Sequence, residues 1–343
     1  MIGYAGNVVA DPNVKWVQFR SYAGPHIRLG TAIDHVPVDH VSRAYWLTTK
    51  VETGAYFGRV MAYDGTCMTA GPDQHIAVYP RELANEDGRA ENDLGSLWGL
   101  FADIRALRGS TPSLDAAIDD LVAEMVSDGF SLGQDGRPRY VAARKVSIKG
   151  RKISVAAGDL VHGNVLRDTY TPMGGRVPAR GPAWEKAKRW AILWHRLTAN
   201  PSGFETQFGF GVRHLVERTK RRRLPGLGPV EEAVYGSAGI EKANLPRALD
   251  LALCVYHAHS VNGPAPANRA LADALKRRPI GRDPEATARE LIARLGNNTY
   301  GRWDDDIKNG RYARTRTHAL KSGLWPRELF EGGDAIMPRD LPG

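Results

Sequence analysis

Residues 51–71 read VETGAYFGRVMAYDGTCMTAG, and they hold the strongest indication of structure and chemistry in the chain. An apolar helical pattern ends here in a carboxylate, Glu52. The glycines that follow punctuate two strand-like runs joined by Asp64-Gly65, a dipeptide typical of hairpin turns. The returning run carries Thr69. The stretch therefore predicts two acids and a hydroxyl around one cleft, which are the groups that hydrolysis of a glycosidic bond requires.

The residues before this hairpin predict a helix that ends at Glu52. Asp39 can cap its start, and Val41, Tyr45 and Thr48 recur at helical spacing on one face. Glu52 continues this stripe at the helix C-terminus, where loss of water and the negative end of the helix dipole both raise the pKa of a carboxyl group. A general acid that works near neutral pH needs that shift.

The segment resembles the active site of the lysozyme-like superfamily, in particular phage-type lysozymes and endolysins, with chitosanases as more distant relatives. In those proteins a catalytic Glu ends a helix, an Asp lies in the following β-hairpin, and a Thr stands just before a Gly in the next strand. Glu52, Asp64 and Thr69-Ala70-Gly71 match in that order. Twelve positions separate Glu52 from Asp64, so the hairpin is longer than is common in phage lysozymes, and Pro72-Asp73 replaces their Gly-rich continuation.

The resemblance implies a peptidoglycan hydrolase that cleaves the glycan strands of the bacterial cell wall. Glu52 would protonate the leaving glycosidic oxygen, while Asp64, helped by Thr69, would hold an attacking water on the opposite face of the sugar. This route inverts the anomeric centre, and inverting enzymes hold their two carboxyl groups about 6.5–9.5 Å apart. We favour inversion because a Thr hydroxyl beside the Asp is suited to orienting a water.

Other residues are candidates for binding the substrate. The resemblance places Tyr56 and Gln74 or His75 along the cleft, and an exposed Trp, either Trp98 or Trp303, would be a sugar subsite. The mechanism needs no cofactor and no metal. His257 and His259 form a His-x-His pair without the spacing of a zinc motif, so we expect them around a core helix.

The expected fold class is α+β and mainly helical: a lysozyme-like fold with a catalytic β-hairpin and a β-rich insertion. Residues 1–136 are expected to form the catalytic region, 137–181 the insertion and 182–343 a basic helical lobe that completes the fold. Apolar residues at helical spacing predict helices over residues 97–104, from Thr111-Pro112 to 125, over 184–197 and over 245–256. Alternation at residues 145–148 and 152–155 predicts a hairpin within the insertion, with a further strand around 160–166.

Charge is unevenly distributed along the chain. Residues 1–136 hold eight more acidic than basic residues, whereas residues 137–343 hold seventeen more basic than acidic ones. The densest run is residues 220–223, KRRR, with further basic clusters at 277–278 and 311–321. Such a run is either a solvated face or a surface that attracts an anionic polymer such as lipopolysaccharide, teichoic acid or nucleic acid.

The sequence also indicates where the protein acts. No apolar run approaches the ~20 residues that span a bilayer, and the N-terminus lacks the pattern of an export signal. The two cysteines, Cys67 and Cys254, form no disulfide framework. Together with these features, the resemblance implies a protein that stays in the host cytoplasm until lysis, or one that is associated with phage virion components, and that acts on the periplasmic cell wall.

Two alternatives remain open at this stage. In the first, a basic, non-enzymatic virion or nucleic-acid-binding protein has kept a lysozyme-like scaffold. In the second, Cys67 and His162 form the nucleophile and base of a peptidoglycan peptidase or amidase. Met68-Thr69-Ala70-Gly71-Pro72 after Cys67 is a poor helix start, so the surroundings of Cys67 fit the hairpin better.

Overall fold

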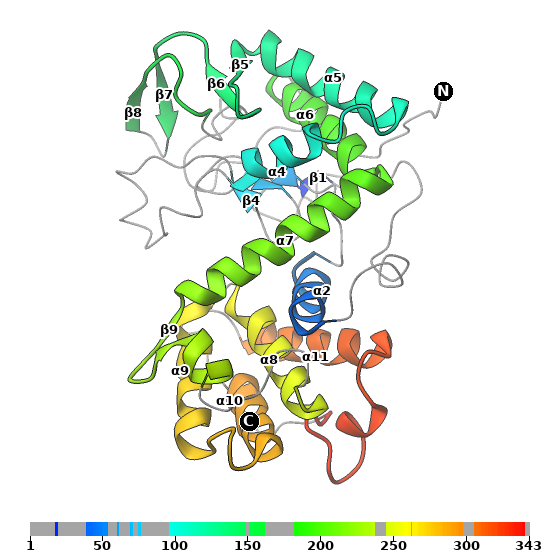
Figure 1. Cartoon of the computed structure of the whole chain (residues 1–343), viewed down its shortest axis with the longest axis vertical. Helices are drawn as coiled ribbons and strands as arrows, with labels where there is room; N and C mark the ends of the chain where they lie inside the picture. Colours follow the sequence, from blue (N-terminus) through cyan, green and yellow to red (C-terminus); the bar gives the residue numbers. More distant parts are fainter. Residues whose placement is uncertain are drawn as a thin grey trace. The chain divides into compact units, whose positions relative to one another are not determined.

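The fold is that of a computed structural model of the 343-residue chain (Figure 1). The structure describes residues 18–19, 39–53, 60–61, 69–70, 75–76, 96–148, 151–161, 182–236, 245–261, 263–297 and 305–339. Over these residues the chain is α+β and mainly helical, as predicted. It divides into two compact units, one made of residues 1–27 and 56–210 and the other of 28–55 and 211–343. The predicted region 1–136 thus contributes to both units.

The first unit combines short antiparallel strands with helices. Its described elements are β1 (Gln18–Phe19), β2 (Val60–Met61), β3 (Thr69–Ala70), β4 (His75–Ile76), α4 (Ser96–Arg105), α5 (Pro112–Ser127), β5 (Phe130–Leu132), β6 (Pro138–Tyr140), β7 (Arg144–Ile148), β8 (Arg151–Val155), α6 (Pro182–Ala199) and the first half of α7 (Pro201–Arg221). Strands β1 to β4 form one antiparallel sheet in sequence order, and β5–β6 and β7–β8 each form a separate pair.

The predicted catalytic hairpin corresponds to the pair β2–β3. Val60 pairs with Ala70 and Met61 with Thr69, so the chain does turn back on itself here. Only residues 60–61 and 69–70 of these two strands lie within the described part of the chain. Gly65 is midway along the chain between the paired residues Met61 and Thr69, but the connection itself lies outside the described residues.

Helices α4, α5 and α6 build the core of the first unit. Thr111 caps α5, because its side chain accepts a hydrogen bond from the Leu114 amide at 3.3 Å, and Pro112 opens the first turn. Leu114, Ile118, Leu121 and Met125 of α5 are buried, and α6 packs against this face with Trp190 and Trp194. The Trp190 indole donates to an Asp128 carboxylate oxygen at 3.0 Å. These apolar stripes form core helices, as predicted.

The pair β7–β8 confirms the hairpin predicted over residues 145–148 and 152–155. Val146 pairs with Ile153 on the face that packs inward, while Lys145 and Lys152 are exposed. Of the strand predicted around residues 160–166, the described residues show only a single bridge between Leu160 and Arg139.

The second unit is helical and centres on α8. Its described elements are α2 (His40–Thr53), the second half of α7, β9 (Arg223–Leu224), β10 (Gly228–Pro229), the π-helix η4 (Glu232–Gly236), α8 (Arg247–Ser260), α9 (Pro264–Arg277), α10 (Pro284–Asn297), α11 (Asp305–Ser322) and the 3₁₀ helix η6 (Arg327–Leu329). Every residue of α8 from position 248 to 260 is buried, because α2, α9 and α10 pack around it. The burial includes His257 and His259, as predicted.

Helix α2 begins and packs as its sequence requires. Asp39 accepts hydrogen bonds from the Ser42 amide at 2.9 Å and the Ser42 hydroxyl at 3.0 Å, so it caps the helix as predicted. Tyr45 lies against α7 at Gly211, where an added Cβ would stand 2.0 Å from the phenol oxygen. Only a glycine permits this close approach of the two helices.

Candidate functional site

The predicted catalytic residues lie in both units. Helix α2 ends at Thr53, so Glu52 is in its last turn. Thr69 is the first residue of β3, and six residues, 54–59, connect α2 to β2. Asp64 and the predicted substrate-binding residues Tyr56 and Gln74 lie outside the described residues. The roles of these residues remain predictions.

His75, the other candidate for lining the cleft, is in β4. Its neighbour across the sheet is Ala70, which follows Thr69 in β3. The imidazole is fully buried, and its ring meets the Phe210 ring edge-on with centroids 5.0 Å apart. Its described surroundings are therefore those of a core side chain.

Trp98 does not meet the condition for a sugar subsite, because its side chain is not exposed. It has no accessible surface, and its indole donates to the Val161 carbonyl at 2.6 Å in the core of the first unit. The apolar pattern of residues 97–104 indicated a buried helix, and Trp98 belongs to that buried face. Trp303, Cys67 and His162 lie outside the described residues.

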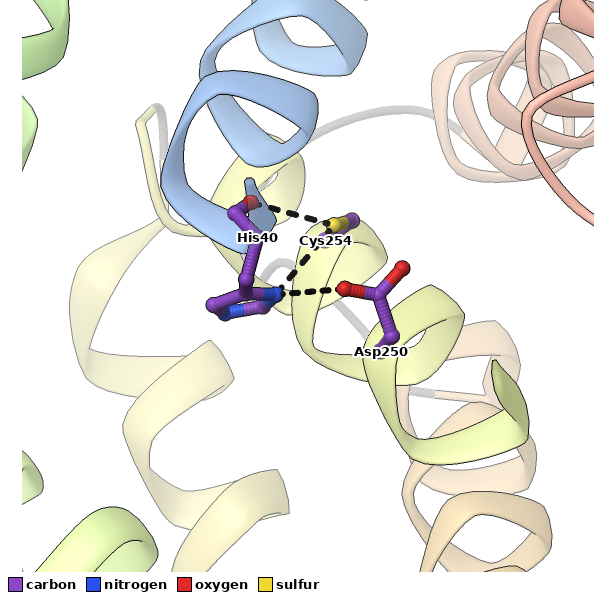
Figure 2. Close-up of side chains that lie close together, drawn as sticks. All are labelled: His40, Asp250 and Cys254. Carbon is purple, nitrogen blue, oxygen red and sulfur yellow. Dashed lines mark hydrogen bonds and ion pairs between the residues drawn. The ribbon is translucent and has the colours of Figure 1, made fainter. Parts of the chain in front are cut away.

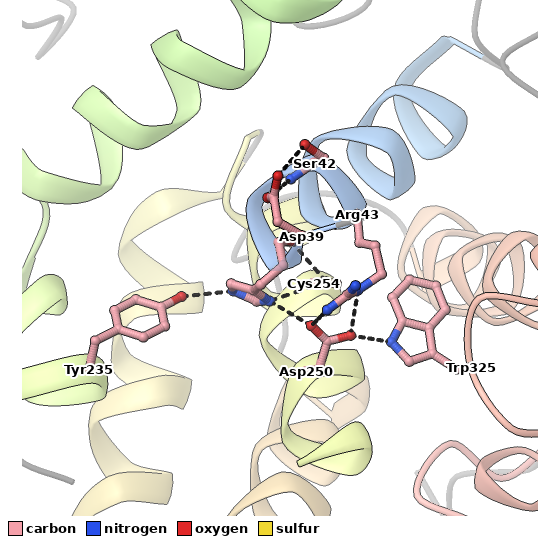
Figure 3. A network of polar contacts seen from close by, with 8 residues as sticks. Asp39, Ser42, Arg43, Tyr235, Asp250, Cys254 and Trp325 are labelled. Atoms are coloured by element: carbon pink, nitrogen blue, oxygen red, sulfur yellow. Dashed lines mark hydrogen bonds and ion pairs between the residues drawn. The ribbon is translucent and has the colours of Figure 1, made fainter. Parts of the chain in front are cut away.

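A buried polar network in the second unit is centred on Asp250 of α8 (Figures 2 and 3). His40 Nδ1 is 2.9 Å from one oxygen of this carboxylate. Arg43 donates to the same oxygen from Nη2 at 2.6 Å and to the second oxygen from Nε at 3.0 Å. The Trp325 indole also donates to the second oxygen. Asp250 thus joins α8 to α2 and to the segment after α11.

The network extends from His40 to the π-helix. His40 Nε2 is 2.8 Å from the hydroxyl of Tyr235, so the imidazole bridges Tyr235 and Asp250 (Figure 3). Cys254 Sγ lies 3.8 Å from His40 Nδ1 and one helical turn from Asp250 (Figure 2). His40 and Arg43 are three positions apart in the first turn of α2, so both face α8.

The electrostatics of this network keep the carboxyl group ionised. Burial alone raises the pKa of Asp250, but the hydrogen bonds and charges of His40 and Arg43 outweigh it, and the pKa lies below its usual value. Burial likewise opposes the charge of Arg43, yet the contacts with Asp250 raise its pKa. Burial, together with the negative charge of Asp250, raises the pKa of the Cys254 thiol well above its usual value. The thiol is therefore held in its neutral form.

His40, Asp250 and Cys254 also form a donor set that zinc accepts, with ligand atoms within 4.8 Å of one another. The Asp250 carboxylate already accepts one hydrogen bond from His40, one from Trp325 and two from Arg43, which use its four acceptor positions. A cation would have to displace these donors and would stand beside the Arg43 guanidinium. The described arrangement is a closed hydrogen-bond network that links α2, α8, η4 and Trp325.

Sequence reasoning missed this network, although one signal could have indicated it. Asp250 stands within the apolar stripe of Leu245, Leu249 and Ala252, and a carboxylate at such a position requires a buried partner. The partners, His40 and Arg43, are 210 and 207 positions away in the sequence.

Comparison of the chain with models of protein families, with curated proteins and with solved structures gave no match. Within the described helices, none has the length and apolar character needed to cross a membrane.

Proposed function

We propose that this protein is a peptidoglycan hydrolase with a lysozyme-like fold, which cleaves glycosidic bonds in the glycan strands of the bacterial cell wall. One observation carries the proposal. A helix with Glu52 in its last turn is followed, after six residues, by the antiparallel pair β2–β3, and Thr69 opens the returning strand. This is the order of elements that the lysozyme-like resemblance requires.

The position of Glu52 suits a general acid. The C-terminal end of a helix carries partial negative charge, which disfavours a second negative charge and raises the pKa of a carboxyl group. A protonated Glu52 can donate its proton to the leaving glycosidic oxygen, which contributes a factor of roughly 10²–10⁴ to the rate of such reactions.

The second acid completes the reaction. Asp64 accepts a proton from an attacking water that Thr69 orients, and the water oxygen forms a bond to the anomeric carbon as the glycosidic bond breaks. The anomeric centre is inverted, and the proton lost by Glu52 leaves with the sugar hydroxyl. No metal or cofactor takes part in this scheme.

We also propose where the enzyme meets its substrate. The enzyme remains in the cytoplasm of an infected cell until lysis, or is carried by phage virion components, and meets its substrate in the periplasmic wall. Its hydrolysis of the wall would release progeny or admit the genome.

The decisive experiment compares the wild-type protein with Glu52→Gln on permeabilised Gram-negative cells, with loss of turbidity as the measure of lysis. We expect Glu52→Gln to lower the rate at least about 100-fold. Glu328→Gln is the matched control, since Glu328 is exposed in η6, and it should lyse cells like the wild type. Equal lysis by wild type and Glu52→Gln, or no lysis by either on several cell walls, would refute the proposal.

The stereochemistry of the product separates the roles of Asp64 and Thr69. NMR of the first product from a chitooligosaccharide or muropeptide should show the inverted anomer. Asp64→Asn should reduce the rate by orders of magnitude, and Thr69→Ala should reduce it less, because both acids remain. A retained anomer, or full activity of Asp64→Asn, would remove Asp64 from the mechanism and leave Glu52 as the acid.

A second candidate is a non-enzymatic protein that binds a polyanion. It is favoured by one observation: Lys220, Arg221 and Arg223 are all exposed. Such a protein would bind its ligand equally well with Glu52 or Gln at position 52, and its affinity would fall with salt.

A further inference from the structure

Two basic runs that are far apart in the sequence meet beside the pair β9–β10 of the second unit. Residues 220–223 end α7 and enter β9, and residues 276–278 end α9, which packs against β9 (Figure 1). The Asn268 side chain of α9 donates to the Arg223 carbonyl at 3.4 Å. The Lys276 ammonium lies 3.3 Å from the position that a Cβ on Gly226 would occupy, in the turn between β9 and β10.

Four exposed cations in these runs make no ion pair with a described residue: Arg221, Arg223, Lys276 and Arg278. We call these four residues the basic surface. The adjacent cations of the two runs do have ion-pair partners: Lys220 pairs with Glu217 at 3.0 Å, and Arg277 lies 3.9 Å from Glu290. Arg222 instead bonds the buried Ser260 hydroxyl.

Helix dipoles explain only part of this arrangement. Basic side chains in the last turn of a helix are stabilised by its negative end, which accounts for Arg221 and Lys276. Arg223 and Arg278 follow the ends of α7 and α9, so the dipoles do not require them. The packing of α9 on β9 brings these four cations together, and the described acid that interacts with one of them, Glu217 with Arg221, already pairs with Lys220.

We propose that the basic surface binds the phosphate groups of a phosphodiester-linked polymer of the bacterial cell envelope. Three of its four residues are arginines, whose planar guanidinium groups bind phosphate through paired hydrogen bonds. The choice of an envelope polymer rests on the proposed function, whereas the recognition of phosphate rests on the surface alone. Every Trp, Tyr and Phe whose side chain the structure describes is buried or half-buried, so these side chains offer no exposed aromatic platform for stacking bases.

The test is a titration of the full chain with poly(glycerol phosphate), monitored by calorimetry. If four phosphates are contacted, affinity should fall about fifty-fold between 50 and 200 mM salt, taking the dependence of a flexible single strand. A variant with glutamine at all four positions of the basic surface should lose at least tenfold in affinity at 50 mM salt. The matched control replaces four other exposed cations by glutamine and should bind nearly as the wild type does: Lys145, Lys152, Arg247 and Lys321.

Cell walls supply the second arm of the test. The Glu52→Gln protein should sediment with purified Gram-positive walls, which carry such polymers, and much less of it should sediment after the phosphate polymers have been removed by acid. Equal binding to treated and untreated walls, or equal losses in the two quadruple variants, would overturn the proposal. So would duplex DNA that binds more than tenfold tighter than poly(glycerol phosphate) at equal phosphate concentration.

Hydrolysis of glycan strands and phosphate binding by the basic surface can be refuted separately. Release of reducing ends from soluble, phosphate-free glycan strands tests hydrolysis without the basic surface. A wild-type protein that cleaves these strands but does not bind poly(glycerol phosphate) would refute the basic surface alone. A protein that binds the polymer but cleaves nothing would refute the hydrolase alone.

Discussion

Replacing Asp250 by Asn should destabilise the second unit strongly, because it removes the charge at the centre of the buried network. The Asp250 side chain has no exposed surface and that of Arg43 only 10%, so water cannot replace the lost partner. The amide also presents a donor where the carboxylate accepted bonds from Arg43 and Trp325. Removing one member of a buried ion pair costs about 3–5 kcal/mol, and we expect the free energy of unfolding to fall by that amount.

The assay is urea unfolding of the full chain at pH 7, followed by circular dichroism. Asp273→Asn is the matched control, since Asp273 is 53% exposed and 3.4 Å from Arg294, and it should cost under about 1 kcal/mol. Adding Arg43→Met to Asp250→Asn should cost less than the two single changes together, because no unpaired cation then remains. If Asp250→Asn unfolds within about 1 kcal/mol of Asp273→Asn, the network does not hold α2 to α8.

Three further predictions follow from buried contacts of the second unit. Gly211→Ala should lower the melting temperature, because its methyl group would overlap Tyr45. Gly310→Ala is the control in α11: its methyl group meets open space, so it should raise the melting temperature slightly. A higher melting temperature for Gly211→Ala than for Gly310→Ala would contradict the close packing of α7 against Tyr45. Burial lowers the pKa of His259 from 6.5 to about 4, so its contribution to stability is complete above pH 6.5 and falls by about 3 kcal/mol as pH drops to 4. Urea unfolding at pH 7.5 and 4.5 should show most of this loss, and the difference between the two pH values should be smaller in His259→Gln. Dialysis against EDTA should leave the melting temperature unchanged, because the acceptor positions of Asp250 are filled by protein donors; a clear decrease would indicate a bound metal.

The amino-acid sequence determined the local elements of this protein. The cap at Asp39, the apolar spacing from Thr111-Pro112 onward and the alternation around residues 145–155 each predicted an element that the structure contains. Caps, helical periodicity and strand alternation depend on residues within a few positions of one another, so they can be recognised in the chain itself. The helix end at Glu52, the hairpin and Thr69 follow one another within eighteen residues, so their order could also be predicted from the sequence.

Only the tertiary structure decided which distant residues meet. His40 and Asp250 are 210 positions apart, and the apolar stripe of α8 indicated that Asp250 needed a partner without indicating which one. The meeting of residues 220–223 with 276–278 likewise depends on how α9 packs against β9. Buried hydrogen bonds and surface charge clusters arise from packing between elements, and spacing within a single element does not encode that packing.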